Sequence, residues 1–102
     1  MINERIAALH EVLRNASPAD DDIAGLYATI KQQRHTGARI VAEALAALGP
    51  FRDDLDLDTA TDVLWLLKDP ALYTALVSER GWPAGRYQAW LARTMQASLL
   101  PA

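Results

Sequence analysis

The amino-acid sequence predicts an all-α protein that forms a single domain over residues 1–102. Apolar residues recur at spacings of three and four through most of the chain, which is the period of helices with one buried face. Hydrophobic residues make up 51% of the chain and aromatic residues only 7%. A hydrophobic fraction supplied mainly by Ala and Leu favours closely packed helices over a β-sandwich. We therefore predict five helices in a compact antiparallel arrangement.

The first helix is predicted from Ile2 to about Asn15, with Ile6, Leu9 and Leu13 on its buried face. The tetrapeptide that follows, residues 17–20, contains signals that end one helix and begin another. Ser17 is expected to cap the second helix, with Pro18 at its first position and Asp20 closing a capping box.

The second helix is predicted to be long, from Pro18 to Leu48, or about 45 Å. A polar side chain at Arg34 and a missing side chain at Gly37 interrupt its apolar stripe, and Gly49 with Pro50 ends it. The residues expected on its buried stripe are Ile23, Leu26, Tyr27, Ile30, Val41, Leu45 and Leu48.

Aspartates mark the starts of the next two predicted helices. Asp56 caps a short helix that extends to about Lys68, and Asp69 caps a fourth helix that extends to about Arg80. Gly81 is the expected C-terminal cap of the fourth helix.

The fifth helix, predicted from Ala84 to Leu99, has an apolar stripe along its whole length. The stripe consists of Tyr87, Trp90, Leu91, Thr94, Met95, Ser98 and Leu99. Together with the fourth helix it presents more apolar surface than a two-helix hairpin can bury, and a second copy of the chain is the usual cover. We therefore predict a homodimer whose interface comprises Tyr73, Leu76, Val77, Tyr87, Trp90, Leu91, Thr94, Met95 and Ser98.

Several short motifs within residues 62–101 form a recognisable set: Asp62-Val63-Leu64-Trp65, Asp69-Pro70 with Tyr73, Glu79-Arg80-Gly81-Trp82, Tyr87 with Trp90-Leu91, and Leu99-Leu100-Pro101. Together these motifs resemble the C-terminal domain of TetR/AcrR-family transcriptional regulators. The resemblance implies a regulatory domain that binds a small-molecule effector and dimerises by forming a four-helix bundle from its last two helices. Family members normally begin with a helix-turn-helix domain, and none precedes Met1 in this sequence. We therefore expect the chain to dimerise without binding DNA by itself.

Arg34 and Gly37 have two alternative interpretations. Arg34 could extend to solvent while Gly37 lets a neighbouring helix approach closely. Alternatively, the two residues open one side of an effector pocket, in which a few polar groups orient an apolar ligand. The pocket predicted in this second case comprises Tyr27, Ile30, Arg34, Gly37, Leu64 and Trp65.

Composition and motif spacing argue against most other functions. The net charge is −3 without a cluster of Lys and Arg, which disfavours DNA binding. The absence of cysteine excludes disulfides and thiolate metal sites. The chain contains neither an apolar run of membrane-spanning length nor a signal peptide, so a cytoplasmic protein is expected.

No pattern of catalytic or metal-ligating residues is present. The acidic run that starts at Asp54 has Thr59 and Trp65 where an EF-hand loop needs Gly and Glu. His10 and His35 lack partners at metal-ligand spacing and are expected to lie on the surface or half-buried. We therefore predict no cofactor, no metal and no enzymatic activity. The alternative function is a stand-alone helical module for protein–protein interaction, without an effector.

Overall fold

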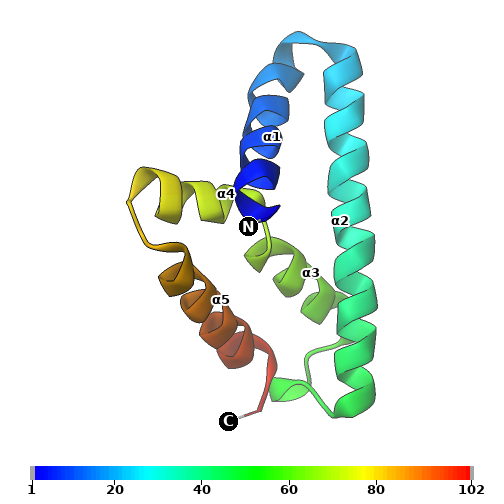
Figure 1. Ribbon diagram of the computed structural model, residues 1–102. Coiled ribbons are helices and arrows are strands. Elements are labelled where there is room, and N and C mark those ends of the chain that lie inside the picture. Colours follow the sequence, from blue (N-terminus) through cyan, green and yellow to red (C-terminus); the bar gives the residue numbers. More distant parts are fainter. Residues whose placement is uncertain (1, 102) are drawn as a thin grey trace.

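The computed structural model describes the backbone over residues 2–101 and the side chains over residues 7–101, and every regular element in this part of the chain is helical (Figure 1). The all-α prediction is therefore confirmed. The elements are α1 (Ile2–Ala16), the 3-10 turn η1 (Ser17–Ala19), α2 (Asp21–Leu48), the 3-10 turn η2 (Arg52–Asp54), α3 (Leu57–Leu67), α4 (Pro70–Tyr73), the wider helical segment η3 (Thr74–Glu79) and α5 (Ala84–Leu99).

The helices form an open arrangement and not the compact one that we predicted. α1 and α2 are antiparallel, α3 runs obliquely beside the lower half of α2, and α4 packs against α1 (Figure 1). The chain measures 43 × 31 × 20 Å and its radius of gyration is 15.1 Å, whereas a packed domain of this length has a radius of about 13 Å. The difference arises because α2 is much longer than the helices that pack against it.

The start of α2 differs from the prediction. Ser17 lies inside the 3-10 turn and its hydroxyl donates to the main-chain oxygen of Arg14, so it does not cap α2. The cap is Asp20, whose backbone is extended and whose carboxylate accepts from the N–H groups of Asp22 and Ile23 at 2.9 and 3.2 Å. An N-cap needs a backbone outside the helical region, and only Asp20 provides it here.

One core cluster joins α2, α3 and α5 and is built largely from small residues. Ala42 of α2 and Ala60 of α3 have no exposed surface, and Thr61 is fully buried with its hydroxyl donating to the oxygen of Leu57 at 2.7 Å. Small side chains on both helices let their backbones approach closely. The cluster consists of Ala38, Ala42, Phe51, Ala60, Leu64 and Leu99.

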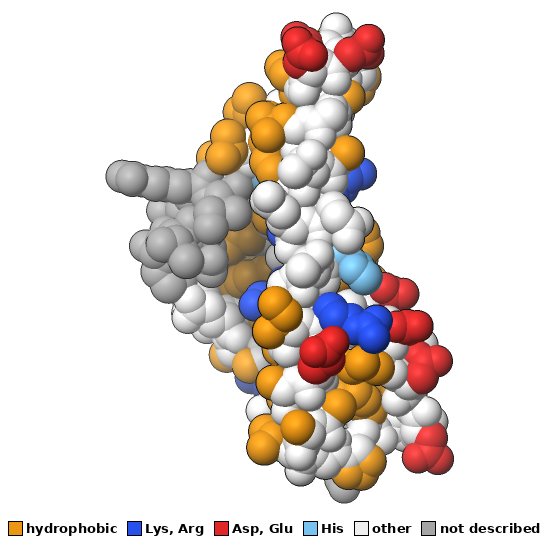
Figure 2. All heavy atoms as spheres, turned by 90° about the vertical axis from the view of Figure 1, so that its right-hand side faces the viewer, with side chains coloured by type: hydrophobic (Ala, Val, Ile, Leu, Met, Phe, Trp, Pro, Cys, Tyr) orange, Lys and Arg blue, Asp and Glu red, His pale blue; other side chains and the backbone are white. Residues whose placement is uncertain are grey.

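The buried face of α2 is therefore not the stripe that we predicted from its larger apolar residues. Leu26, Val41 and Leu48 were expected inside, but their side chains are 52%, 40% and 86% exposed. On α1, Leu9 was likewise expected inside and is 58% exposed, whereas His10 is buried. Figure 2, which faces α2, shows apolar side chains left uncovered at several heights along the helix.

A second cluster forms where α1, α4 and α5 meet. Ala7, Tyr73 and Tyr87 are its buried members. From Thr74 the fourth helix widens, and Arg80 donates to the oxygen of Ala75 five residues earlier at 3.1 Å. Gly81 has the positive φ of a helix-terminating glycine, as predicted, and the N–H of the next residue, Trp82, returns to the oxygen of Leu76 at 2.9 Å.

Candidate functional site

Arg34, near the middle of α2, lies on the wall of two neighbouring hollows. The first has a volume of about 220 Å³ and extends toward α4 and α5; the second has a volume of about 280 Å³ and lies between α2 and α3. The first hollow, which we call the Arg34 cavity, is lined by Arg34, Lys68, Asp69, Pro70, Tyr73, Tyr87 and Leu91. The second is lined by Arg34, Gly37, Ala38, Val41, Trp65 and Lys68.

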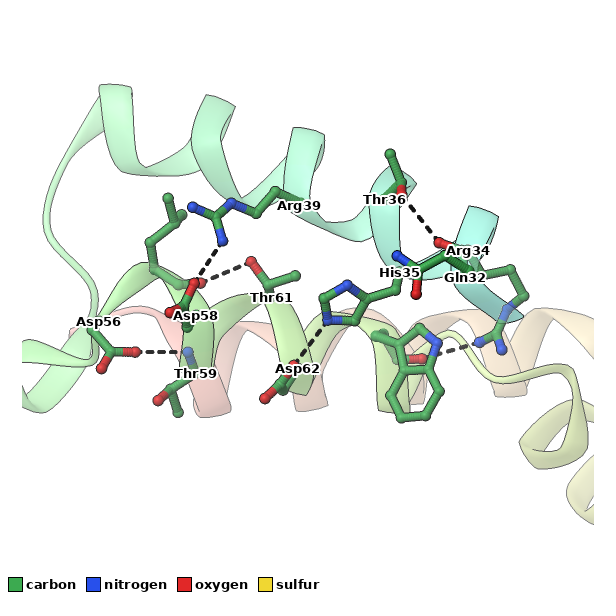
Figure 3. Close-up of polar contacts among 12 residues, drawn as sticks. Gln32, Arg34, His35, Thr36, Arg39, Asp56, Asp58, Thr59, Thr61 and Asp62 are labelled. Atoms are coloured by element: carbon green, nitrogen blue, oxygen red, sulfur yellow. Dashed lines mark hydrogen bonds and ion pairs between the residues drawn. The ribbon is translucent and has the colours of Figure 1, made fainter. Parts of the chain in front are cut away.

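The guanidinium of Arg34 makes one hydrogen bond and leaves other donors unused. Nη2 donates to the main-chain oxygen of Trp65 at 3.1 Å, and the guanidinium carbon lies 5.8 Å from the centre of the Trp65 ring (Figure 3). Nη1 is shielded from solvent and has no acceptor among the described residues. The indole nitrogen of Trp65 is also buried without a partner. Buried donors without acceptors are uncommon in proteins because each one costs free energy.

His10 adds a second unpartnered polar group near the Arg34 cavity. Its side chain is 4% exposed, and neither ring nitrogen has a hydrogen-bond partner in the described part of the chain. Nε2 lies 3.9 Å from Oδ1 of Asp69, a residue that lines the cavity, while the ring packs edge-on against Tyr27 at 5.2 Å. Burial lowers the pKa of His10 from its usual value, although the charge of Asp69 acts in the opposite direction. His10 was expected on the surface or half-buried, and this expectation is wrong because α1 packs against α4 through this face.

The carboxylate of Asp69 is used by the fold itself. Its Oδ1 accepts from the N–H of Ala71 at 2.9 Å and caps α4, as the sequence predicted. Burial raises the pKa of Tyr87, and the negative charge of Asp69 adds to this effect. Asp69 therefore supplies the cavity with negative charge close to two aromatic hydroxyl-bearing residues, Tyr73 and Tyr87.

The structure brings together half of the effector pocket that we predicted from the sequence. Arg34, Gly37 and Trp65 line the second hollow. The remaining three lie elsewhere: Tyr27 contacts His10 and Lys31, Ile30 is half-buried outside both hollows, and Leu64 belongs to the core. A methyl group added at Gly37 would touch nothing within 4 Å, so Gly37 does not serve a close approach of helices.

Sequence reasoning missed Lys68, Asp69 and Pro70 as lining residues, because we interpreted them only as a helix end and a cap. Only the meeting of α2 with the junction of α3 and α4 places these residues beside Arg34. No local pattern indicates that contact, since Arg34 and Lys68 are far apart in the sequence.

The predicted dimer stripe is partly covered within the chain. Tyr73 and Tyr87 are 5% and 4% exposed and pack edge-to-face at 5.4 Å. Trp90 is half-buried between Tyr87 and Trp82, and Arg86 stacks on the ring of Trp82 at 4.0 Å. The other predicted interface residues are also half-buried: Leu76, Val77, Leu91, Thr94, Met95 and Ser98. The stripe thus retains exposed surface, but its two tyrosines face the interior of the chain.

Other polar side chains of α2 contact α3 beside Arg34. Arg39 pairs with Asp58 at 2.6 Å, and His35 contacts Asp62 at 3.0 Å (Figure 3). Within α2, Arg39 also pairs with Glu43 at 3.2 Å. These side chains are mostly exposed, so each pair contributes little to stability. Within residues 7–101 no group of three or more acidic or histidine side chains is arranged to hold a metal ion.

None of the known protein families, curated proteins or solved structures compared with this chain matches it. The resemblance to TetR/AcrR regulators therefore rests on the sequence motifs alone. None of the helices in the described part of the chain is both long and apolar enough to cross a membrane.

Proposed function

We propose that this chain is a regulatory helical domain similar to that of TetR/AcrR regulators, which binds a small-molecule effector and associates as a dimer. The observation that supports effector binding is the position of Arg34. This residue lies on the wall of two hollows, and its guanidinium has a buried Nη1 without an acceptor among the described residues. Ligand sites commonly combine mostly apolar walls with a few such convergent polar groups.

The position of Arg34 suggests how an effector would act. One side of its guanidinium holds the last turn of α3 through the oxygen of Trp65, and the other side reaches the cavity formed with α4 and α5. A ligand that competes for the guanidinium would change how α3 packs against α2, and it would also affect α5 because α5 packs against α3. Such a ligand shifts the balance between two packings by its difference in affinity for them, which is the basis of allosteric regulation.

The observation that supports dimerisation is the half-exposed stripe of α5 and η3. A stable dimer buries roughly 1,200–2,000 Å² in total, commonly with aromatic residues and Met at its centre. Trp90, Leu91 and Met95 offer such side chains along one face of α5.

Light scattering tests the dimer at micromolar concentration, where we expect twice the chain mass of 11.2 kDa. Trp90→Asp should give monomer, whereas Leu26→Asp, at a 52% exposed position on α2, should leave the dimer intact. Because Trp90 is half-buried and its replacement could disturb the fold, Ser98→Arg provides a second variant on the same stripe. A monomeric wild-type chain would contradict the dimer. If Leu26→Asp dissociated the dimer and the α5 variants did not, the interface would lie on α2 and not on α5.

Effector binding is tested by thermal shift against a varied library of small apolar molecules. A ligand at 100 times its dissociation constant should add roughly 2.7 kcal/mol to the free energy of unfolding. Arg34→Gln should weaken the response to hits that bind the Arg34 cavity. A chain that is folded but responds to no compound would contradict the effector role.

The exposed apolar side chains of α1 and α2 support a second candidate, a helical interaction module without an effector. Val12, Ile40 and Leu48 are 64%, 64% and 86% exposed, so these large apolar side chains are available for contact with a partner. Under this alternative the chain would show no response to small molecules while Leu48→Asp would reduce its self-association.

A further inference from the structure

We propose that the Arg34 cavity takes a small carboxylate with an aromatic or compact apolar body, a molecule of the size and charge of benzoate. This inference rests on the proposed effector role and names the chemical class of ligand for it. It is carried by the volume of the cavity, by the excess of positive charge without ion pairs on its wall, and by the aromatic side chains that share the wall.

The volume of the cavity limits the size of the ligand. It measures about 220 Å³, whereas sites for drug-sized ligands measure roughly 300–1,000 Å³. An enclosed apolar cavity of about 150 Å³ is enough to hold benzene. A single ring with one small polar substituent therefore fits the Arg34 cavity, and a larger ligand would need the walls to move.

The charges on the cavity wall favour an anion. Arg34 and Lys68 are both on the wall, and neither forms an ion pair with any described side chain. Asp69 is the acidic lining residue, but its Oδ1 is engaged with the N–H of Ala71 and faces His10. The wall therefore carries two cations that form no ion pair with a described residue, and one carboxylate that already accepts a hydrogen bond.

Arg34 is suited to a carboxylate in particular. Carboxylates accept two parallel hydrogen bonds from a guanidinium, which makes this pairing stronger and more directional than a bond to a neutral acceptor. The single hydrogen bond to the oxygen of Trp65 leaves Nη1 without an acceptor. Because Nη1 is shielded from solvent, a ligand would reach it after a rotation of the guanidinium, and the resulting bond would satisfy a donor that the unliganded chain leaves unpaired.

The rest of the wall is apolar or aromatic. Tyr73 and Tyr87 contribute two rings that pack at 86° to each other, and Pro70 and Leu91 complete this side. A flat hydrocarbon body can contact ring faces and aliphatic atoms here while its carboxylate points to Arg34. A bare inorganic anion would leave these apolar walls without a partner.

The test compares three probes of nearly identical shape by isothermal titration calorimetry on the full chain: benzoate, neutral benzamide and cationic benzylamine. We expect benzoate to bind at least about tenfold more tightly than benzamide, the effect of exchanging a neutral hydrogen bond for a charge-assisted one. Benzylamine should bind least. Arg34→Gln should remove the preference for benzoate, Lys68→Gln should reduce it, and the matched control Arg93→Gln on the exposed side of α5 should leave it unchanged.

The outcomes separate this inference from the proposed function. If benzamide binds as well as benzoate, the ligand class is wrong while effector binding stands. If no probe binds to a chain that circular dichroism shows to be folded, the carboxylate class is overturned, and the library screen above then decides on effector binding.

If Arg34→Gln does not fold, changes in the amide chemical shifts of the wild-type chain on adding benzoate show where benzoate binds. Benzoate should then perturb the amides of residues 68–73 and 87–91, and Leu91→Trp, which fills the cavity, should abolish these shifts. Perturbations confined to other parts of the chain would overturn the proposal.

Discussion

The guanidinium of Arg34 donates a hydrogen bond of 3.1 Å to the main-chain oxygen of Trp65, 31 positions later in the chain. Trp65 lies in the last turn of α3, which ends at Leu67. Main-chain oxygens in the last turn of a helix lack partners within the helix, and a cation there also interacts favourably with the helix dipole. Arg34 of α2 therefore caps the C-terminal end of α3 by a hydrogen bond from another helix, in addition to lining the cavity.

Replacing Arg34 by Met should lower the free energy of unfolding by about 1–2 kcal/mol, because the oxygen of Trp65 loses a charged donor. The loss is limited because the substitution also removes the unpartnered Nη1. Urea denaturation monitored by circular dichroism measures the difference. Arg93→Met is the control: Arg93 is exposed and has no ion pair with a described residue, so its replacement should change stability by no more than about 0.5 kcal/mol. A variant Arg34→Met as stable as the wild type would contradict a net stabilising role of Arg34.

Gly37 should be replaceable by Ala with a gain in stability. It lies inside α2, is exposed, and has open space around the position of a Cβ atom. Glycine in a helix interior costs roughly 0.5–1 kcal/mol relative to alanine, and Gly37→Ala should recover this amount. Gly81→Ala provides the contrast, because Gly81 has a φ of 75° and a side chain there costs roughly 1–2 kcal/mol. Thermal unfolding of both variants should therefore move in opposite directions, and a destabilised Gly37→Ala would contradict the structure around Gly37.

The helix ends could be predicted largely from the sequence because each depends on local chemistry. Asp56 and Asp69 cap α3 and α4 through their own side chains, and Gly81 takes the positive φ expected of it. The start of α2 is the exception: we predicted Ser17 as its cap, but the cap is Asp20. Both residues have side chains able to cap a helix. The difference lies in a 3-10 turn of three residues that the capping pattern does not specify.

The buried face of α2 and the candidate site could not be predicted in the same way. Periodicity ranks Leu26 and Leu48 above Ala38 and Ala42, because it weighs hydrophobicity and not the distance between helix backbones. The structure buries the two alanines and exposes the two leucines. The cavity depends on residues far apart in the chain, such as Arg34 and Lys68, coming to line one hollow, and a single sequence contains no record of this.

The alanine interface between α2 and α3 leads to a third prediction. Ala42 has no exposed surface, so Ala42→Leu would force extra atoms between two closely packed helices. Overpacking of this kind typically costs 1–3 kcal/mol, and we expect a loss of about 2 kcal/mol in the free energy of unfolding. Ala46→Leu, one turn later on an exposed face of α2, should change stability by less than about 0.5 kcal/mol. Equal effects of the two substitutions would show that α2 and α3 are not in tight contact at Ala42.

His10 gives the chain a pH dependence whose direction follows from its surroundings. Burial is the main cause that lowers its pKa below the usual 6.5, with Arg34 and Arg14 acting the same way and Asp69 and Glu11 opposing them. Below pH 6.5 the unfolded chain therefore binds a proton at this position that the folded chain does not. Stability must then fall as the pH decreases from 6.5 toward the lower pKa of the folded state.

The variant His10→Gln should lose less stability than the wild type when the pH falls from about 7.5 to 5.5, as measured by urea denaturation. The reason is that glutamine does not titrate in the range where an unperturbed histidine does. Carboxylates contribute to the pH dependence of both proteins, and comparison of the two curves removes their common part. Proton NMR of the His10 ring gives the pKa directly. A value above 6.5 would mean that attraction to Asp69, 3.9 Å away, outweighs burial, and the wild type would then gain stability from His10 as the pH falls.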